Sequence, residues 1–396
     1  MRKVFFLGVQ DFSGPALHPF NDAGLHPFND AGLHPFNDAG LHPFNDAGLR
    51  PFNRAVAADA ALSSQTLAQA LRTTRADLFR ADDPPPKMRA LSGAKREDDK
   101  LRRWEPAPRM EACLFELLSS LRFEHGSLWH APRLDKQGAS QPAIKLISIT
   151  APDDSGLEEQ AKLVLKRTPE RGDRLAEILV QVDDLWSFWT AITNLDPQTV
   201  ARTAEVVEFA RRFATSVVMR LKHDLACPRP ADVSASVQPV IRTPGHGSLP
   251  SGHATVAFMV RRVLSALLDV KAGDPIDQQL ERLAHRVADN RVVAGLHYPM
   301  DSVAGRLLGE TLADAFVSAC TGKALIVAGA AFNGKALNAK PADYFSGSPL
   351  EVITTIEAST NTPGSKPAEA WQGDDVLAKC MWRAAVNELA ALGFRP

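Results

Sequence analysis

The chain has 396 residues, of which 45% are apolar, so it can bury the core of one large globular domain or two small ones. Its formal net charge of -1 at pH 7 gives no overall field that would draw it to nucleic acid or to an anionic membrane. Any strongly basic site must therefore be local. The four cysteines lie far apart and form no Cys-X-X-Cys pair, which argues against a zinc knuckle or a disulfide framework.

The first residues do not predict export. The apolar stretch after the basic start is only about six residues long, shorter than the roughly 7–15 residues of a signal peptide. No segment approaches the ~18 uninterrupted apolar residues of a membrane span. We therefore expect a soluble, cytoplasmic protein.

Residues 16–54 repeat an eight-residue unit of the type AGLHPFND. This period is too short for a solenoid, and each unit carries Pro, Gly, Asn and Asp, which favour turns. One Phe and one Leu per unit do not compensate the entropy of ordering eight residues. We predict a mobile, low-complexity arm over residues 1–54, with a metal-binding tract as the alternative because a histidine recurs in the repeats (His18, His26, His34 and His42).

Hydrophobic periodicity divides the rest of the chain into three parts. Residues 55–150 are predicted to hold a helix over 54–80, a polar Pro-rich linker over 81–109 and a mixed segment with a short helix and a strand over 143–150. Residues 331–396 form a loop and a last helix that packs on the core. The part between them, 151–330, has apolar residues at three and four spacing in six stretches: 156–167, 171–192, 197–225, 252–270, 275–293 and 301–319. The fold class predicted is all-α, a helical bundle.

A first cluster of candidate site residues is the stretch LKHDLACPRP. Lys222 and Arg229 are seven residues apart, or two helical turns, so both can project from one helix face. Two cations would then point at one place. The alternative is that they only complement the dipole at a helix end.

A second cluster is the stretch LPSGH, which precedes an apolar helix. We expect Pro250 in the first helical turn, with the amides of Ser251, Gly252 and His253 free of intrahelical acceptors. Such a helix end binds anions. Ser251 adds a hydroxyl, and His253 adds a group that exchanges protons near neutral pH. An ordinary N-cap role for Ser251 is the alternative.

A third cluster contains Arg291, His297 and Asp301. Gly295 and Pro299 are expected to interrupt the helix around His297, so that its ring can turn inward. Asp301 is placed to cap the following helix or to fix the tautomer of His297, which would leave the other ring nitrogen as a base, nucleophile or metal ligand. The alternative is a histidine packed at a kink beside an N-cap.

Together, the three clusters resemble the three-part signature of the type 2 phosphatidic acid phosphatase and vanadium haloperoxidase superfamily. The resemblance rests on Lys222 with Arg229-Pro230, on Pro250 to His253, and on Arg291 with His297 and Asp301, and it covers residues 205–320. Asn290 departs from the pattern, because the family usually has Ser before this Arg; we expect little consequence since Asn also donates a hydrogen bond. The resemblance implies an all-α bundle with its site between helices, and a catalytic core within residues 151–330.

The resemblance implies two alternative enzymes that share one oxyanion cradle, formed by Lys222, Arg229, Ser251, Gly252 and Arg291. An acid phosphatase would need no cofactor and would act on a phosphate ester: His297 attacks phosphorus, His253 protonates the leaving oxygen and Asp301 orients His297. A vanadium-dependent haloperoxidase would hold vanadate with His297 as its protein ligand. Lys222 would then polarise bound hydrogen peroxide, and His253 would move protons as a halide is oxidised.

His246 favours the haloperoxidase, because it stands seven residues before His253, where bromide-oxidising members of the family are similar to this chain. The short interval from His253 to Arg291 favours the phosphatase, as does the stretch LHYPMD. We take the haloperoxidase as the leading hypothesis, with His246 as a halide or neighbouring residue. A non-catalytic anion-binding or interaction protein is the third alternative, and the paired histidines argue against it. The sequence leaves open whether the protein forms a homodimer.

Overall fold

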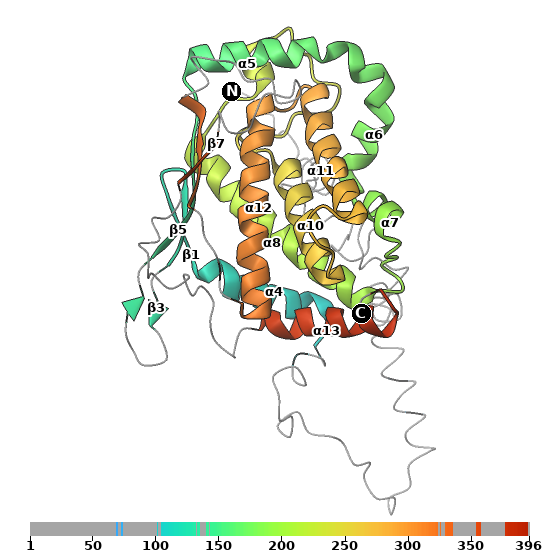
Figure 1. Ribbon diagram of the computed structural model, residues 1–396. Helices are drawn as coiled ribbons and strands as arrows, with labels where there is room; N and C mark the ends of the chain where they lie inside the picture. Colours follow the sequence, from blue (N-terminus) through green and yellow to red (C-terminus); the bar gives the residue numbers. More distant parts are fainter. Residues whose placement is uncertain are drawn as a thin grey trace, which may run out of the picture.

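Four long helices form the centre of the molecule: α8 (Ala201–Leu225), α10 (Gly252–Leu268), α11 (Pro275–Val293) and α12 (Pro299–Thr321). Helix α10 packs against the other three (Figure 1). Phe209 and Phe213 of α8 contact Phe316 of α12 inside this bundle, and all three rings are fully buried. The predicted helical bundle is confirmed.

The computed structural model describes residues 104–131, 143–323, 329–335 and 377–394, together with 69, 73, 101, 133–134, 140–141, 325 and 354–357. The predicted arm over 1–54 lies outside the described residues. So do nearly all of the predicted helix over 54–80, most of the predicted linker over 81–109 and most of the predicted loop after 331. Among the helices described, none is both long and apolar enough to cross a membrane.

Shorter helices close the two ends of the bundle (Figure 1). Helices α4 and α13 both pack against α8 at one end, whereas α5 and α6 lie at the other. Their bounds, with those of the remaining helices, are α4 Pro106–Ser119, α5 Asp154–Lys166, η4 Thr168–Glu170, α6 Arg171–Asp183, α7 Trp186–Thr193, α9 Pro230–Val233 and α13 Ala378–Ala391.

A small sheet lies beside the bundle, against α12 and α8 (Figure 1). Its strand order is β1-β2-β5-β6-β7, and only β5 and β6 pair in parallel. Of these five strands, the sequence predicts only β5. The bounds are β1 Leu121–Glu124, β2 Ser127–His130, β5 Ile144–Thr150, β6 Gly329–Asn333 and β7 Thr354–Glu357; a separate pair consists of β3 Arg133–Leu134 and β4 Ser140–Gln141.

Two predicted boundaries are wrong. The predicted single helix over 171–192 is two helices, because Asp184 adopts an extended backbone and its Oδ1 accepts the Ser187 amide at 2.9 Å, which starts α7 anew. The predicted linker over 81–109 ends early, since α4 begins at Pro106. Proline suits the first helical position because its missing N–H would have no intrahelical partner there.

Candidate functional site

The start of α10 lies directly against the start of α12. The Ser251 amide donates to the Asp301 carbonyl at 2.9 Å. Glycine permits this approach, because a Cβ at Gly305 would lie 2.7 Å from the Ser251 carbonyl oxygen. The second and third sequence clusters are therefore adjacent in space.

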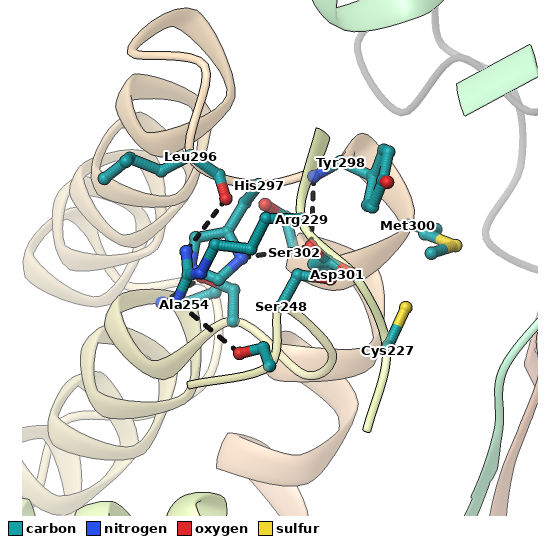
Figure 2. Close-up of polar contacts among 12 residues, drawn as sticks. Cys227, Arg229, Ser248, Ala254, Leu296, His297, Tyr298, Met300, Asp301 and Ser302 are labelled. Atoms are coloured by element: carbon teal, nitrogen blue, oxygen red, sulfur yellow. Dashed lines mark hydrogen bonds and ion pairs between the residues drawn. The ribbon is translucent and has the colours of Figure 1, made fainter. Parts of the chain in front are cut away.

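The predicted interruption before His297 is confirmed. Helix α11 ends at Val293, and Gly295 follows with a φ of +82°, a conformation that favours glycine. The Leu296 amide bonds back to the Arg291 carbonyl at 3.1 Å, and the Leu296 carbonyl accepts Arg229 Nη1 at 2.9 Å. Figure 2 shows Arg229 reaching this carbonyl beside His297.

His297 is held by Asp301. Its Nδ1 lies 3.0 Å from Asp301 Oδ2, which also accepts the Tyr298 amide at 3.0 Å. Asp301 is therefore the third residue of α12 and not its N-cap, which is Tyr298. Because the carboxylate accepts, the proton lies on Nδ1 and the lone pair of the neutral ring lies on Nε2. Burial raises the pKa of Asp301 to about 7, against the opposing charge of Lys222.

Lys222 and Arg229 meet, although not along one helix as the spacing predicts. Helix α8 ends at Leu225, Ala226 turns into the left-handed region, and Arg229 is the N-cap of α9. Lys222 Nζ donates to the carbonyls of Gly247 and Ser248 at 2.6 and 2.8 Å. The turn after α8 and the irregular segment before α10 thus bring the first cluster to the second.

Arg229 and His246 contact one another. Arg229 Nε donates to the His246 carbonyl at 2.9 Å, and Nη2 lies 3.1 Å from His246 Nδ1. The same Nδ1 lies 3.2 Å from the Gly247 carbonyl, which only accepts, so it can accept from Arg229 in one tautomer or donate to Gly247 in the other. Burial lowers the pKa of His246 to about 4, and the charges of Lys222 and Arg229 act in the same direction.

The start of α10 differs from the prediction in two details. Pro250 precedes the N-cap instead of lying in the first turn, and the Ser251 amide is taken by Asp301. Ser251 is the N-cap, its hydroxyl accepting the Ala254 amide at 3.4 Å. The amides of Gly252 and His253 are the first of the helix and have no intrahelical acceptor. These two amides are the ones left to bind an anion.

His253 points toward α6. Its Nε2 lies 3.1 Å from the Gln181 carbonyl, so Nε2 carries the proton and Nδ1 the lone pair. Burial lowers the pKa of His253 well below 6.5, and the Arg291 charge adds to this. The imidazole is therefore neutral at pH 7 and able to accept a proton at Nδ1.

Arg291 is fully buried without a carboxylate partner. Its Nη2 donates to the Ile178 carbonyl at 2.9 Å and lies 3.5 Å from Gln181 Oε1, whereas Nε and Nη1 have no partner among the described residues. Burial lowers its pKa to about 10. Arg109, in contrast, is buried with its Nη2 2.6 Å from Glu205 Oε2. An unpaired buried guanidinium is costly unless a ligand anion meets it.

The nine predicted site residues lie in one region, and all but the half-buried His246 are buried. Among the described residues, no salt bridge to a carboxylate involves Lys222, Arg229 or Arg291, whose acceptors are carbonyl, amide and imidazole atoms. Burial and the charges of Lys222 and Arg229 lower the pKa of His297 well below 6.5. Within the same part of the chain, no group of three His, Cys, Asp or Glu residues could hold a metal cation. This arrangement suits an anion.

Gln181 belongs to this region and was missed by the sequence analysis. On α6 the apolar residues Leu175, Leu179 and Val180 are 40–50% exposed, whereas Gln181 is fully buried. An apolar periodicity therefore gives no signal for it. Only its position three residues before the break at Asp184 sets it apart, and that is no evidence of function.

Comparison with known proteins gives a distant relationship. No protein-family model matches the chain. The vanadium-dependent bromoperoxidase of Ascophyllum nodosum is 33% identical over an alignment of 94 residues, which covers 18% of this chain and 17% of that enzyme. A solved bacterial vanadium-dependent iodoperoxidase covers 58% of this chain and 50% of its own at 16% identity, with a TM-score of 0.28. The chain is thus weakly similar to a vanadium haloperoxidase, and the similarity spans less than a fifth of either sequence.

Proposed function

We propose that this protein is a vanadium-dependent haloperoxidase, which oxidises a halide with hydrogen peroxide. One observation carries the proposal: three buried basic side chains have no salt bridge to a carboxylate among the described residues, with Lys222 and Arg229 near the His297–Asp301 pair and Arg291 near His253. The weak similarity to a bromoperoxidase supports vanadate as the anion.

The residues present fit vanadate. The unpartnered Nε and Nη1 of Arg291 would donate to its oxygens, with the first amides of α10 and the hydroxyl of Ser251. The lone pair on His297 Nε2 would be the protein ligand, because Asp301 holds the proton on Nδ1. When bound, vanadate supplies a Lewis-acid centre that activates peroxide for two-electron halide oxidation.

His253 and Lys222 would perform the proton and charge steps. His253 is neutral at pH 7, so its Nδ1 accepts a proton from incoming peroxide and later returns it to the leaving oxygen. Burial and the charge of Arg229 lower the pKa of Lys222 well below 10.5, and its Nζ, held by two carbonyls, would stabilise negative charge as it develops. His246 contacts Arg229 and would lie beside the anion, where we place the halide.

Acid phosphatase activity is the second candidate, because the lone pair on His297 Nε2 also suits attack on phosphorus. The sign of the vanadate effect separates the two enzymes. We expect orthovanadate to activate the oxidation of bromide by peroxide. If the protein hydrolyses para-nitrophenyl phosphate and orthovanadate inhibits it, the phosphatase is correct.

Matched variants check that the activity arises at this site. His297→Ala is expected to abolish turnover, whereas His223→Ala removes an exposed histidine of the same chain and is expected to change nothing. Vanadate binding without turnover of either substrate would favour a non-catalytic anion-binding protein.

A further inference from the structure

The side chain of Gln181 bridges two residues of the neighbouring helix. Its Oε1 accepts Asn290 Nδ2 at 2.9 Å and lies 3.5 Å from Arg291 Nη2. Asn290 Nδ2 also donates to Glu177 Oε2 at 3.0 Å, so both of its amide protons are used within the protein. The sequence predicts that Asn290 still donates a hydrogen bond where the family has Ser; it does so to Gln181 and Glu177, and it thereby fixes the orientation of Gln181.

This orientation leaves Gln181 Nε2 without a partner among the described residues. The side chain is 0% exposed, and a buried amide whose protons bond to nothing loses the hydrogen bonds it makes with water. Such an atom alone is no evidence of a ligand, since Gln160 Nε2 is also buried without a partner. Gln181 differs because it lies beside Arg291, whose Nε and Nη1 are unpartnered too.

The main chain of the same residue contacts the proposed proton carrier. The Gln181 carbonyl accepts His253 Nε2 at 3.1 Å, and the nearby Ile178 carbonyl accepts Arg291 Nη2 at 2.9 Å. One turn of α6 thus touches His253, Asn290 and Arg291. None of the three sequence clusters lies on α6, so Gln181 Nε2 is an unsatisfied donor that they do not supply.

We propose that Gln181 is a further binding residue for the oxyanion, donating from Nε2 alongside Arg291, and that its backbone carbonyl positions His253. The inference rests on the proposed anion site. The amide is neutral and donates without adding charge, so it would bind phosphate-like and vanadate-like anions alike.

The test compares Gln181→Glu with Gln160→Glu by calorimetric titration with orthovanadate and with inorganic phosphate. Glutamate keeps the acceptor for Asn290 and Arg291 but replaces the donor with a charge that repels the anion. We expect Gln181→Glu to bind both anions at least 100-fold more weakly than wild type at pH 7. The affinity of Gln160→Glu for both anions should stay within threefold of wild type. A carboxylate at this position also pairs with Arg291, so the uncharged variant Gln181→Met separates the two roles: a purely structural role for Gln181 predicts that Gln181→Met binds both anions within threefold of wild type.

Gln181→Met is measured alongside the glutamate variant, because it removes the donor without adding a charge beside Arg291. It removes one hydrogen bond to a charged ligand and should weaken binding about 10–100-fold. Binding within threefold of wild type in either folded Gln181 variant, or an equal loss in Gln160→Glu, overturns the inference. If wild type itself binds neither anion, or if Arg291→Met binds them as tightly as wild type, the proposed anion site is wrong, which is a different result.

Discussion

Asp301 Oδ2 accepts two hydrogen bonds at 3.0 Å, one from His297 Nδ1 and one from the Tyr298 amide. Both donors belong to the turn that starts α12, so the carboxylate joins the backbone at the helix start to the ring that it orients. The ring cannot rotate without breaking the first of these bonds. The position of His297 Nε2 therefore depends on Asp301.

We expect Asp301→Asn to lower orthovanadate affinity and turnover about 10–100-fold, because the amide no longer stabilises one tautomer of His297. The measurement is titration calorimetry together with steady-state kinetics. Asp277→Asn is the control: that buried carboxylate pairs with Arg261, away from the proposed site. It should reduce stability and leave anion affinity unchanged, and a loss of affinity in the control alone would contradict the role given to Asp301.

Arg291→Met should bind anions at least 100-fold more weakly without losing stability. Its guanidinium is buried without a counter-ion, so its removal is expected to leave the free energy of unfolding unchanged or raise it by up to about 3 kcal/mol. Arg109→Met should instead cost about 3–5 kcal/mol, because it leaves Glu205 buried with only the weaker contact to Arg202. Urea unfolding of both variants checks the contrast. Equal destabilisation would show that Arg291 is a structural residue.

Binding of a dianion is predicted to take up protons. Burial and neighbouring cations lower the pKa of His253 and of His297, and a bound anion would raise both toward their ordinary value. Sulfate suits the measurement because it has no titrating proton near pH 6. Titrations at pH 6 in buffers of different ionisation enthalpy should give a positive number of protons bound, smaller in His253→Ala. Zero uptake would mean that these imidazoles do not face the anion.

Stability should fall in acid because of histidines such as the half-buried His285, whose pKa is lowered to about 4 by partial burial and by the charge of Arg306. The unfolded chain binds more protons than the folded one between about pH 6.5 and 4, so stability is full above this window and is lost as pH falls through it. Each such histidine contributes a slope of about 1.4 kcal/mol per pH unit.

Urea unfolding from pH 7 to 4 measures this slope, which His285→Gln should reduce. The variant lacks the titrating group but leaves the proposed anion site intact. An unchanged slope would place the acid sensitivity elsewhere in the chain.

Local pattern predicts the helices of the bundle well, since apolar spacing over 15 or more residues reports which face is buried. It fails where contacts between distant parts of the chain determine the secondary structure. The strands β1, β2, β6 and β7 have four or five residues each, and β6 pairs with β5 from more than 180 residues away, so no local periodicity marks them. The seven-residue spacing predicts that Lys222 and Arg229 project from one helix face. In the structure the helix ends at Leu225, and a left-handed turn at Ala226 brings the two side chains together instead.

In the candidate site, too, the sequence predicts the features that depend on local backbone preferences and misses those that depend on tertiary packing. Gly295 and Pro299 can be recognised in the sequence because their backbone preferences act locally, and the break they predict is present. Gln181 cannot be recognised in the sequence, because its burial depends on α6 packing against α11 with its polar side inward.

A crystal structure of the protein soaked with orthovanadate tests the central claim most directly. We predict one tetrahedral or five-coordinate anion bonded to His297 Nε2 and within hydrogen-bond distance of Lys222, Arg229 and Arg291. An anion bound elsewhere, or side chains of these residues that stay bonded only to the protein at saturating vanadate, would contradict the account.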